Sequence, residues 1–253
     1  MKIELKGKVA LVTGGSGQLG RVICRTLGAC GADVAVHYHQ NRQQAFKVRD
    51  AILAMGVRSM AVQADITDGA SIASMRTIME KEFGRPDIMV NNAVVQYAWT
   101  SILEQSVADY ESQFRSSVLH NVLMAKAFIP GMIEKRYGRV IAINTECAMQ
   151  ASPGQSAYVS GKRGMDGVLR VLAREVGEHQ ITVNQVAPGW MISENVQDHD
   201  GQWEREYRKN VPLKRRGQDQ DVANLVAFLA SDLAGFISGQ YISVSGGNVM
   251  PAI

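Results

Sequence analysis

The chain has 253 residues, a formal net charge of +3 at pH 7 and 46% hydrophobic residues. This length is sufficient for one α/β domain with a sizeable core. It contains no run of five or more basic residues, so we expect no nucleic-acid track. Charges interrupt every apolar stretch well before the roughly 18 residues that indicate a membrane span.

The three cysteines, Cys24, Cys30 and Cys147, show no metal-ligand spacing and no disulfide framework. We therefore predict no metal site. The cysteine usage suits a reducing compartment, and residues 1–6 lack the apolar core of a secretory signal, so we expect a cytoplasmic protein without membrane partners. The densest basic cluster, 214–216, is predicted to be a solvated loop.

Short apolar runs alternate with helical patterns along the whole chain. The runs predict strands near 9–13, 33–37, 59–63, 88–91, 139–144, 182–187 and 241–245. The longest helical segments are expected at about 106–135 and 156–177. Such alternation predicts an α/β fold, a doubly wound Rossmann-type parallel sheet of about seven strands with helices on both faces. No linker, repeat or low-complexity segment divides the chain, so we expect one domain over residues 1–253.

A glycine-rich loop, Gly14–Gly20, directly follows the first predicted strand. Glycines let backbone N–H groups approach a pyrophosphate, and a helix beginning near Gln18 presents its positive end to the same anion. We therefore predict a dinucleotide-binding loop. Its expected cofactor contacts are Gly14, Ser16, Gly17, Gln18, Leu19 and Gly20.

The end of the second predicted strand bears on which dinucleotide binds. An acidic residue about 20 residues after the glycine loop would bind the ribose hydroxyls of NAD. The run 34–42 contains no acid, and Asp33 precedes the strand, at the edge away from the cofactor. His39 and Arg42 are available for a 2′-phosphate, although Arg42 could equally be a solvated residue of the next helix. We predict that NADP(H) is favoured over NAD(H).

A tyrosine and a lysine, Tyr158 and Lys162, lie four residues apart in a predicted helix and therefore share one face. A cation near a phenol favours the phenolate and lowers the pKa of the phenol. With Lys162 beside it, Tyr158 could exchange a proton with a carbonyl or alcohol oxygen.

These two motifs, in this order, resemble those of the short-chain dehydrogenase/reductase family, including members of the 3-oxoacyl reductase and glucose dehydrogenase type. The resemblance runs from about Leu5 to Val249. In this family, an Asp-hydrophobic pair contacts adenine, an Asn-Asn-Ala segment lies near the cofactor, and a Pro-Gly turn lies under the nicotinamide. The matching residues here are Asp65, Ile66, Asn92, Ala93, Pro188 and Gly189.

The resemblance implies reversible hydride transfer between the nicotinamide of NADP(H) and a carbonyl or secondary alcohol of a small molecule. Tyr158 would pass the proton. Lys162 would lower the pKa of Tyr158 and hydrogen-bond the nicotinamide ribose. The resemblance also implies a homotetramer, which the two long helical segments support. Independently of the resemblance, residues 190–212 are rich in charge and follow a strand end, where doubly wound sheets bind ligands, so we expect a substrate lid there; a surface excursion is the alternative.

The sequence departs from the family pattern at several positions. Thr145 stands where the family has a catalytic serine, and it keeps a hydroxyl that can orient a substrate oxygen. Asn144 offers an amide as an alternative. Ser117 aligns with the family's catalytic asparagine, and Asn121 lies one helical turn further on. Val94 replaces the glycine after Asn-Asn-Ala.

The glycine loop itself also departs from the family pattern, because Gln18 replaces its middle glycine. The resulting spacing resembles the family's extended branch, which includes nucleotide-sugar epimerases and carries an additional carboxy-terminal region. We favour the shorter, dehydrogenase-like branch, because this chain ends soon after Gly246. Two alternatives remain: epimerase-like activity, and a cofactor-binding protein with little or no turnover.

Overall fold

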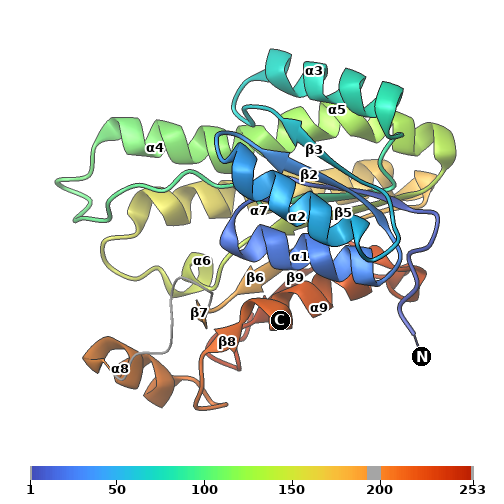
Figure 1. Cartoon of the computed structure of the whole chain (residues 1–253). Helices are drawn as coiled ribbons and strands as arrows, with labels where there is room; N and C mark the ends of the chain where they lie inside the picture. The colour runs from blue at the N-terminus through green and yellow to red at the C-terminus, as the bar shows by residue number, and fades with distance from the viewer. Residues whose placement is uncertain (1, 193–200, 252–253) are drawn as a thin grey trace.

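A computed structural model describes residues 2–192 and 201–251. Seven parallel strands form one sheet in the order β3-β2-β1-β4-β5-β6-β9 (Figure 1). These strands are β1 (Val9–Val12), β2 (Asp33–Tyr38), β3 (Ser59–Gln63), β4 (Ile88–Asn91), β5 (Gly138–Ile143), β6 (Ile181–Pro188) and β9 (Tyr241–Val244). Two short strands, β7 (Met191–Ile192) and β8 (Gly217–Gln218), pair with each other beside the main sheet. The predicted doubly wound sheet is confirmed.

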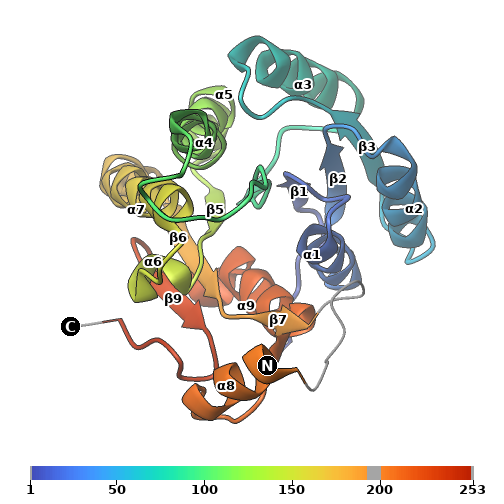
Figure 2. The same cartoon turned by 90° about the vertical axis from the view of Figure 1, so that its left-hand side faces the viewer.

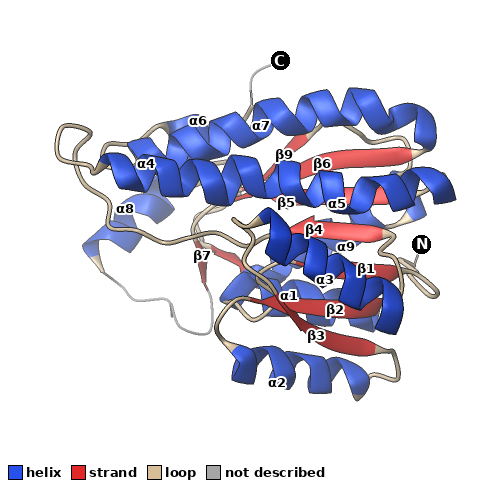
Figure 3. Cartoon of the chain, turned by 90° about the horizontal axis from the view of Figure 1, so that it is seen from above, coloured by secondary structure: helices blue, strands red, loops and turns tan. Residues whose placement is uncertain are grey.

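Helices cover both faces of the sheet (Figures 2 and 3). One layer contains α1 (Gln18–Ala29), α2 (Arg42–Leu53) and α9 (Asp219–Ala230). The opposite layer contains α3 (Gly69–Glu82), α5 (His120–Lys135) and α7 (Ser156–Val176). The remaining helical segments are α4 (Val107–Gln113), α6 (Cys147–Gln150), α8 (Gln202–Asn210), the π-helical turn η1 (Phe114–Leu119) and the 3-10 turns η2 (Gly177–His179) and η3 (Asp232–Ala234).

Strand residues alternate between the two cores. In β1, Ala10 and Val12 pack toward α1 and α9, whereas Leu11 packs into the opposite core with α3 and α5. The central strands β4, β5 and β6 are buried along their whole length. Because side chains on a strand point alternately to the two faces, these apolar runs are what a sheet covered on both sides requires.

The predicted helix at 106–135 is a continuous helical rod, but a π-helical turn interrupts its regular geometry. The turn η1 joins α4 to α5 and packs against α7. The contact is close, since a Cβ at Gly164 of α7 would lie 2.9 Å from Cγ2 of Val118 in η1. Among the described helices, none combines the length and the apolar character that crossing a bilayer needs.

Candidate active site

The glycine loop lies at the carboxyl ends of the central strands, where doubly wound sheets bind ligands. Gly14 has a φ of +64°, and a Cβ at Gly20 would lie 2.1 Å from the Gly14 carbonyl oxygen. Only glycine fits at position 20, so helix α1 begins directly against the loop. The six residues predicted to contact a dinucleotide all line one cavity of about 740 Å³. They are Gly14, Ser16, Gly17, Gln18, Leu19 and Gly20.

The strand ends beside this loop are held together by side chains. The Thr13 hydroxyl accepts hydrogen bonds from the backbone N–H groups of Asn92 (2.9 Å) and Ala93 (3.1 Å). The Asn92 amide in turn donates to the Thr13 carbonyl oxygen at 3.0 Å. Asn92, Ala93 and Val94 also line the cavity. The Asn-Asn-Ala segment therefore fixes the glycine loop as well as lying where a cofactor would bind.

Asp65 and Ile66 line the same cavity, at the end of β3. The Asp65 carboxylate accepts from the backbone N–H (2.8 Å) and the hydroxyl (2.7 Å) of Thr67. Burial acts to raise the pKa of Asp65, but the two hydrogen bonds from Thr67 outweigh it, and the pKa lies below its usual value. The aspartate is therefore a charged acceptor at the cavity wall.

Sequence reasoning did not single out His37, which is buried at the end of β2 and lines the cavity. Its Nδ1 accepts from the Gly14 N–H at 3.0 Å, and its Nε2 lies 3.0 Å from the Ala64 carbonyl oxygen. Desolvation lowers the pKa of His37 to about 4. The ring is therefore neutral at pH 7, with Nε2 as the donor, and it connects the glycine loop to β3.

The two residues predicted to bind a 2′-phosphate are placed differently. His39 lines the cavity, together with Gln40 and Asn41. Arg42 is not among the lining residues; it begins α2, and its guanidinium lies over the Phe46 ring, 4.8 Å from the centroid. The structure thus brings His39, but not Arg42, to the wall of the cavity.

Tyr158 and Lys162 lie in the first turns of α7, and both line the cavity. The Thr145 side chain lies close enough to the Tyr158 hydroxyl to lower the pKa of that phenol. The Lys162 ammonium donates to the Ile143 carbonyl oxygen at 2.6 Å and lies 5.8 Å from the centroid of the Tyr158 ring. Tyr158 and Lys162, four residues apart on α7, therefore both lie beside the end of β5.

The prediction that Lys162 lowers the pKa of Tyr158 does not match this arrangement. Burial raises the pKa of Tyr158 to about 12, although the Thr145 side chain acts to lower it. Desolvation also lowers the pKa of Lys162 to about 8. The ammonium is directed to the Ile143 carbonyl rather than to the phenol, and burial disfavours the charged form of both groups.

Two aromatic residues from the segment after β4 contact the tyrosine. The Tyr97 hydroxyl accepts from the backbone N–H of Tyr158 at 2.7 Å. The Trp99 ring stacks on the Tyr158 ring with centroids 5.9 Å apart and an interplanar angle of 27°. These contacts fix both the backbone and the ring of Tyr158.

Thr145 is buried where β5 ends, and its hydroxyl oxygen accepts from the Cys147 N–H at 3.2 Å. The alternative oxygen partner, Asn144, has both amide atoms occupied by protein groups. Its Oδ1 accepts from the Thr145 N–H at 2.9 Å, and its Nδ2 donates to Gln185 at 2.7 Å. The Thr145 hydroxyl is therefore the better placed group to hold a substrate oxygen.

Ser117 lies in η1, is buried, and is not among the residues that line the cavity. Its carbonyl oxygen accepts from the Asn121 amide at 2.7 Å, and Asn121 Oδ1 accepts from the Asn91 amide at 2.7 Å. Ser117 aligns with the family's asparagine, and Asn121, one helical turn further on, donates its side-chain hydrogen bond to the Ser117 carbonyl oxygen. Sequence reasoning identified Asn121 but did not predict these two hydrogen bonds.

The predicted lid at 190–212 includes residues 193–200, which lie outside the described part of the chain. Its described helix α8 is attached to the site through Glu146, which is buried. The Glu146 carboxylate accepts from the Tyr207 hydroxyl at 2.8 Å and the Asn248 amide at 3.0 Å. Burial raises the pKa of Glu146. A Cβ at Gly189 would lie 2.6 Å from the Tyr207 oxygen, so the Pro188–Gly189 turn needs its glycine.

The prediction that 214–216 is a solvated loop is wrong for Arg216, whose side chain is fully buried. Its guanidinium forms an ion pair with Glu204 of α8, donates to the Met191 carbonyl oxygen at 2.6 Å and stacks on Trp190 at 4.2 Å. Three consecutive basic residues in a sequence do not indicate that one of them is buried. The acidic partner lies twelve residues earlier in the chain, in α8.

The cavity residues fit a nicotinamide dinucleotide. The glycine loop leaves room for a close backbone approach, and the start of α1 lines the cavity, where a helix N-terminus can bind an anion. Comparisons with known proteins agree. A family profile described as enoyl-(acyl carrier protein) reductase matches residues 16–248. The 3-oxoacyl-[acyl-carrier-protein] reductase FabG of Staphylococcus aureus is 37% identical over 245 residues, covering 96% of this chain and 98% of the relative.

The chain belongs to the short-chain dehydrogenase/reductase family. FabG of Escherichia coli is 36% identical, covering 98% of this chain and all of the relative. A solved short-chain dehydrogenase/reductase of Serratia marcescens, a double mutant, is 31% identical with a TM-score of 0.90, covering 96% of this chain and 98% of the solved chain. As a member of this family, the protein is an NAD(P)-dependent oxidoreductase that acts on carbonyl groups.

Proposed function

We propose that this protein reduces a ketone, or oxidises the corresponding secondary alcohol, with Tyr158 passing the proton. One observation carries the proposal: Tyr158, Thr145 and Lys162 line the same cavity as the glycine loop. A nicotinamide bound in that cavity would supply or accept the hydride. A tyrosine that is neutral at pH 7 suits the direction of reduction, in which it donates its proton.

The roles of the neighbouring residues follow from their contacts. Thr145 would hold the substrate oxygen through its hydroxyl, which is both a donor and an acceptor. Lys162 would bind the nicotinamide ribose and take part in proton exchange, because a lysine with a pKa of about 8 changes its charge near neutral pH. Ser117 would act only through its backbone, since its side chain does not line the cavity.

We propose NADP(H) as the preferred cofactor. Support comes from the missing acid at the end of β2 and from His39 at the cavity wall. Arg42 would assist from the start of α2 rather than through direct burial in the site. As the relatives are named 3-oxoacyl-[acyl-carrier-protein] reductases, a 3-oxoacyl thioester is the first substrate to test. The cysteine usage supports a cytoplasmic location.

The test follows nicotinamide absorbance with NADPH and with NADH. The substrates are an acetoacetyl thioester, an aldose and a cyclic ketone, each run in the direction of reduction. We expect NADPH-dependent turnover of at least one of them. Binding of NADPH without turnover of any ketone would favour the alternative of a cofactor-binding protein. Interconversion of a nucleotide sugar without net reduction would favour the epimerase-like alternative.

We also propose that the chain forms a homotetramer, in which α5 and α7 provide one of the interfaces. These two helices border an apolar groove at the surface. Val171 is 55% exposed there, beside residues such as Ile129 and Val168. A second copy of the same helix pair would cover this groove, as isologous contacts do in symmetric oligomers. Light scattering should give four times the monomer mass for the parent and a smaller mass for Val171→Glu.

A further inference from the structure

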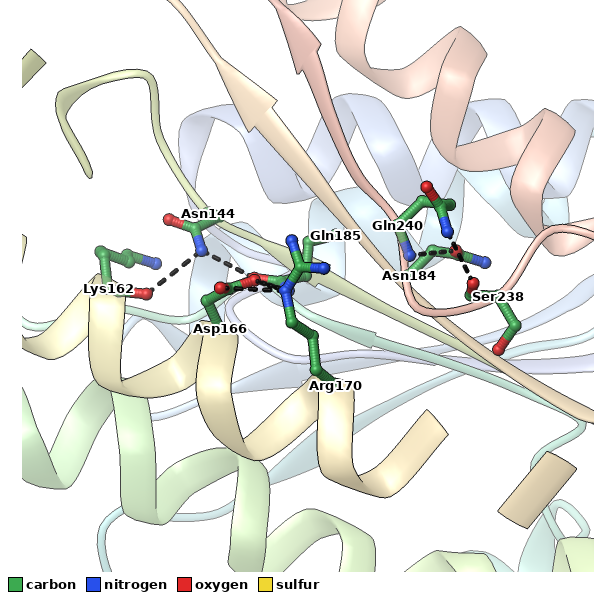
Figure 4. Close-up of polar contacts among 8 residues, drawn as sticks. All are labelled: Asn144, Lys162, Asp166, Arg170, Asn184, Gln185, Ser238 and Gln240. Atoms are coloured by element: carbon green, nitrogen blue, oxygen red, sulfur yellow. Dashed lines mark hydrogen bonds and ion pairs between the residues drawn. The ribbon is translucent and has the colours of Figure 1, made fainter. Parts of the chain in front are cut away.

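A continuous chain of side-chain hydrogen bonds connects α7 to the ends of β5 and β6 (Figure 4). The Gln185 amide Nε2 donates to the Asp166 carboxylate at 2.7 Å. The Asn144 amide Nδ2 donates to Gln185 Oε1 at 2.7 Å and to the Lys162 carbonyl oxygen at 3.2 Å. Asn144 Oδ1 accepts from the Thr145 N–H at 2.9 Å. This series of hydrogen bonds therefore begins at the Asp166 carboxylate and ends at Thr145 and Lys162, two residues of the proposed catalytic group.

The carboxylate sets the direction of every bond in this chain. A carboxylate can only accept, so Gln185 must present its NH₂ to Asp166 and its oxygen to Asn144. Asn144 must then present its own NH₂ to Gln185 and its oxygen to Thr145. Asn144 and Gln185 are 2% and 1% exposed, so a flipped amide would leave buried polar groups unpaired. Arg170 holds Asp166 in place, at 2.9 and 3.0 Å from its two oxygens.

The backbone of Thr145 is held from both sides. Asn144 accepts from its N–H, and the Tyr241 hydroxyl of β9 donates to its carbonyl oxygen. Lys162 is held in a similar way, since Asn144 donates to its carbonyl oxygen while its ammonium donates to Ile143. Asn144 is thus the point at which the placement of Thr145 and the placement of Lys162 are coupled.

We infer that Asp166, Gln185 and Asn144 are positioning residues that set where the Thr145 hydroxyl and the Lys162 ammonium lie relative to Tyr158. This inference rests on the roles proposed above for Thr145 and Lys162. Asp166 and Gln185 act on the reaction only through Asn144. Small displacements of reacting groups cost large factors in rate, so the loss of this chain affects turnover more than substrate binding.

Neighbouring positions on β6 offer a matched pair of variants. Gln185→Leu breaks the chain. Asn184→Leu removes an equally buried amide, which accepts from the Gln240 N–H at 3.1 Å (Figure 4) and donates to the Ile237 carbonyl oxygen at 2.7 Å. Both variants leave buried partners unpaired, so both should lower the unfolding temperature. Only Gln185→Leu should lower kcat per folded enzyme, by about tenfold.

The measurements use NADPH and the acetoacetyl thioester, at a temperature where circular dichroism shows both variants folded. We expect Gln185→Leu to lower kcat with little change in KM, and to shift the pH-rate profile that Lys162 and Tyr158 determine. Asn184→Leu should retain the parental kcat and pH-rate profile. Equal kcat per folded enzyme in the two variants would show that the hydrogen bonds among Asp166, Gln185 and Asn144 contribute to stability alone. If Gln185→Leu does not fold, Asp166→Ala, at a partly exposed position, removes the acceptor of the first bond and gives the same readouts.

A double variant tests the direction of the bonds. Gln185→Glu alone would place two carboxylates against each other and should be the most impaired. Asp166→Asn added to Gln185→Glu exchanges donor and acceptor in the first bond and keeps the second, so it should recover most of the lost kcat. A double variant as impaired as Gln185→Glu would overturn the inference. Tyr158→Phe is assayed in parallel, because retained activity there would overturn the proposed function instead.

Discussion

The two ends of the cavity are built in different ways. Around the glycine loop, the surfaces are backbone groups and small residues, and the hydrogen bonds run between neighbouring strand ends, as at Thr13 and Asn92. Around Tyr158, large side chains meet from distant segments, as where Tyr97 and Trp99 contact Tyr158 and, behind the cavity wall, Tyr207 and Asn248 reach Glu146. The structure of the glycine-loop end depends on the close approach of backbone groups. The structure of the Tyr158 end depends on a few charged or aromatic side chains. Substitutions should therefore act differently at the two ends.

The largest expected effect is on turnover at the Tyr158 end. Tyr158→Phe removes only the phenolic oxygen, so the ring can still stack on Trp99. General acid catalysis contributes about 10²- to 10⁴-fold, and kcat should fall by that factor while NADPH binding changes little. Steady-state kinetics and isothermal titration measure the two quantities. As a control, Thr145→Ser should keep activity, whereas Thr145→Val should lose most of it. Parental activity of the phenylalanine variant would exclude Tyr158 as the proton carrier.

The next effect concerns stability at the same end. Arg216→Met leaves the buried Glu204 with only a longer ion pair, to Arg208 at 3.9 Å, and breaking a buried ion pair costs about 3–5 kcal/mol. We expect the free energy of unfolding to fall by that amount in a denaturant titration, with the loss centred on α8. Adding Glu204→Met should restore part of it, because the uncompensated carboxylate is removed. A single variant as stable as the parent would mean that Arg216 contributes through packing alone.

A pH titration tests the glycine-loop end. The pKa of His37 is about 4 in the fold and near 6.5 in an unfolded chain, so the unfolded state binds the proton first as pH falls. Its contribution to stability is complete above pH 6.5 and is lost as pH falls through 4. At pH 5 the loss is roughly 2 kcal/mol. Buried His120, with a pKa of about 3, adds a similar loss.

The matched variant is His37→Gln, which can still accept from Gly14 and donate to Ala64 without titrating. Denaturant unfolding at pH 7.5 and pH 5 should show a smaller difference between the two pH values in this variant than in the parent. The same pH dependence in both would show that His37 is not the titrating group.

The smallest effect is expected for Arg42. Its guanidinium packs over Phe46 and does not line the cavity, so Arg42→Ala should weaken NADPH binding by less than about tenfold. His39→Ala, at the cavity wall, should weaken it more. Isothermal titration with NADPH and NADH gives both affinities. A larger loss for the Arg42 variant would mean that the side chain turns toward the phosphate when the cofactor binds.

The sequence predicted the fold well, because the signals for it are local. Apolar runs give strands, glycines give the loop, and the seven strands lie within about one or two residues of their predicted bounds. It predicted less at the Tyr158 end. Neither the burial of Arg216 nor the link from Glu146 to Asn248 leaves a pattern in a short window. The hydrogen bond between Asn91 at the end of β4 and Asn121 at the start of α5 joins residues thirty positions apart, which no short window of sequence indicates.

The π-helical turn η1 also changes how the helical rod from α4 to α5 uses its surface. Each additional residue rotates all later side chains by about 100° around the axis of an α-helix. Before η1, the backbone of Gln113 in α4 packs against Gly161 of α7. After η1, Met124 and Phe128 of α5 face the sheet. A one-residue deletion within Phe114–Leu119 would keep the rod straight but rotate one half against the other. The length of this segment is therefore as constrained as its composition.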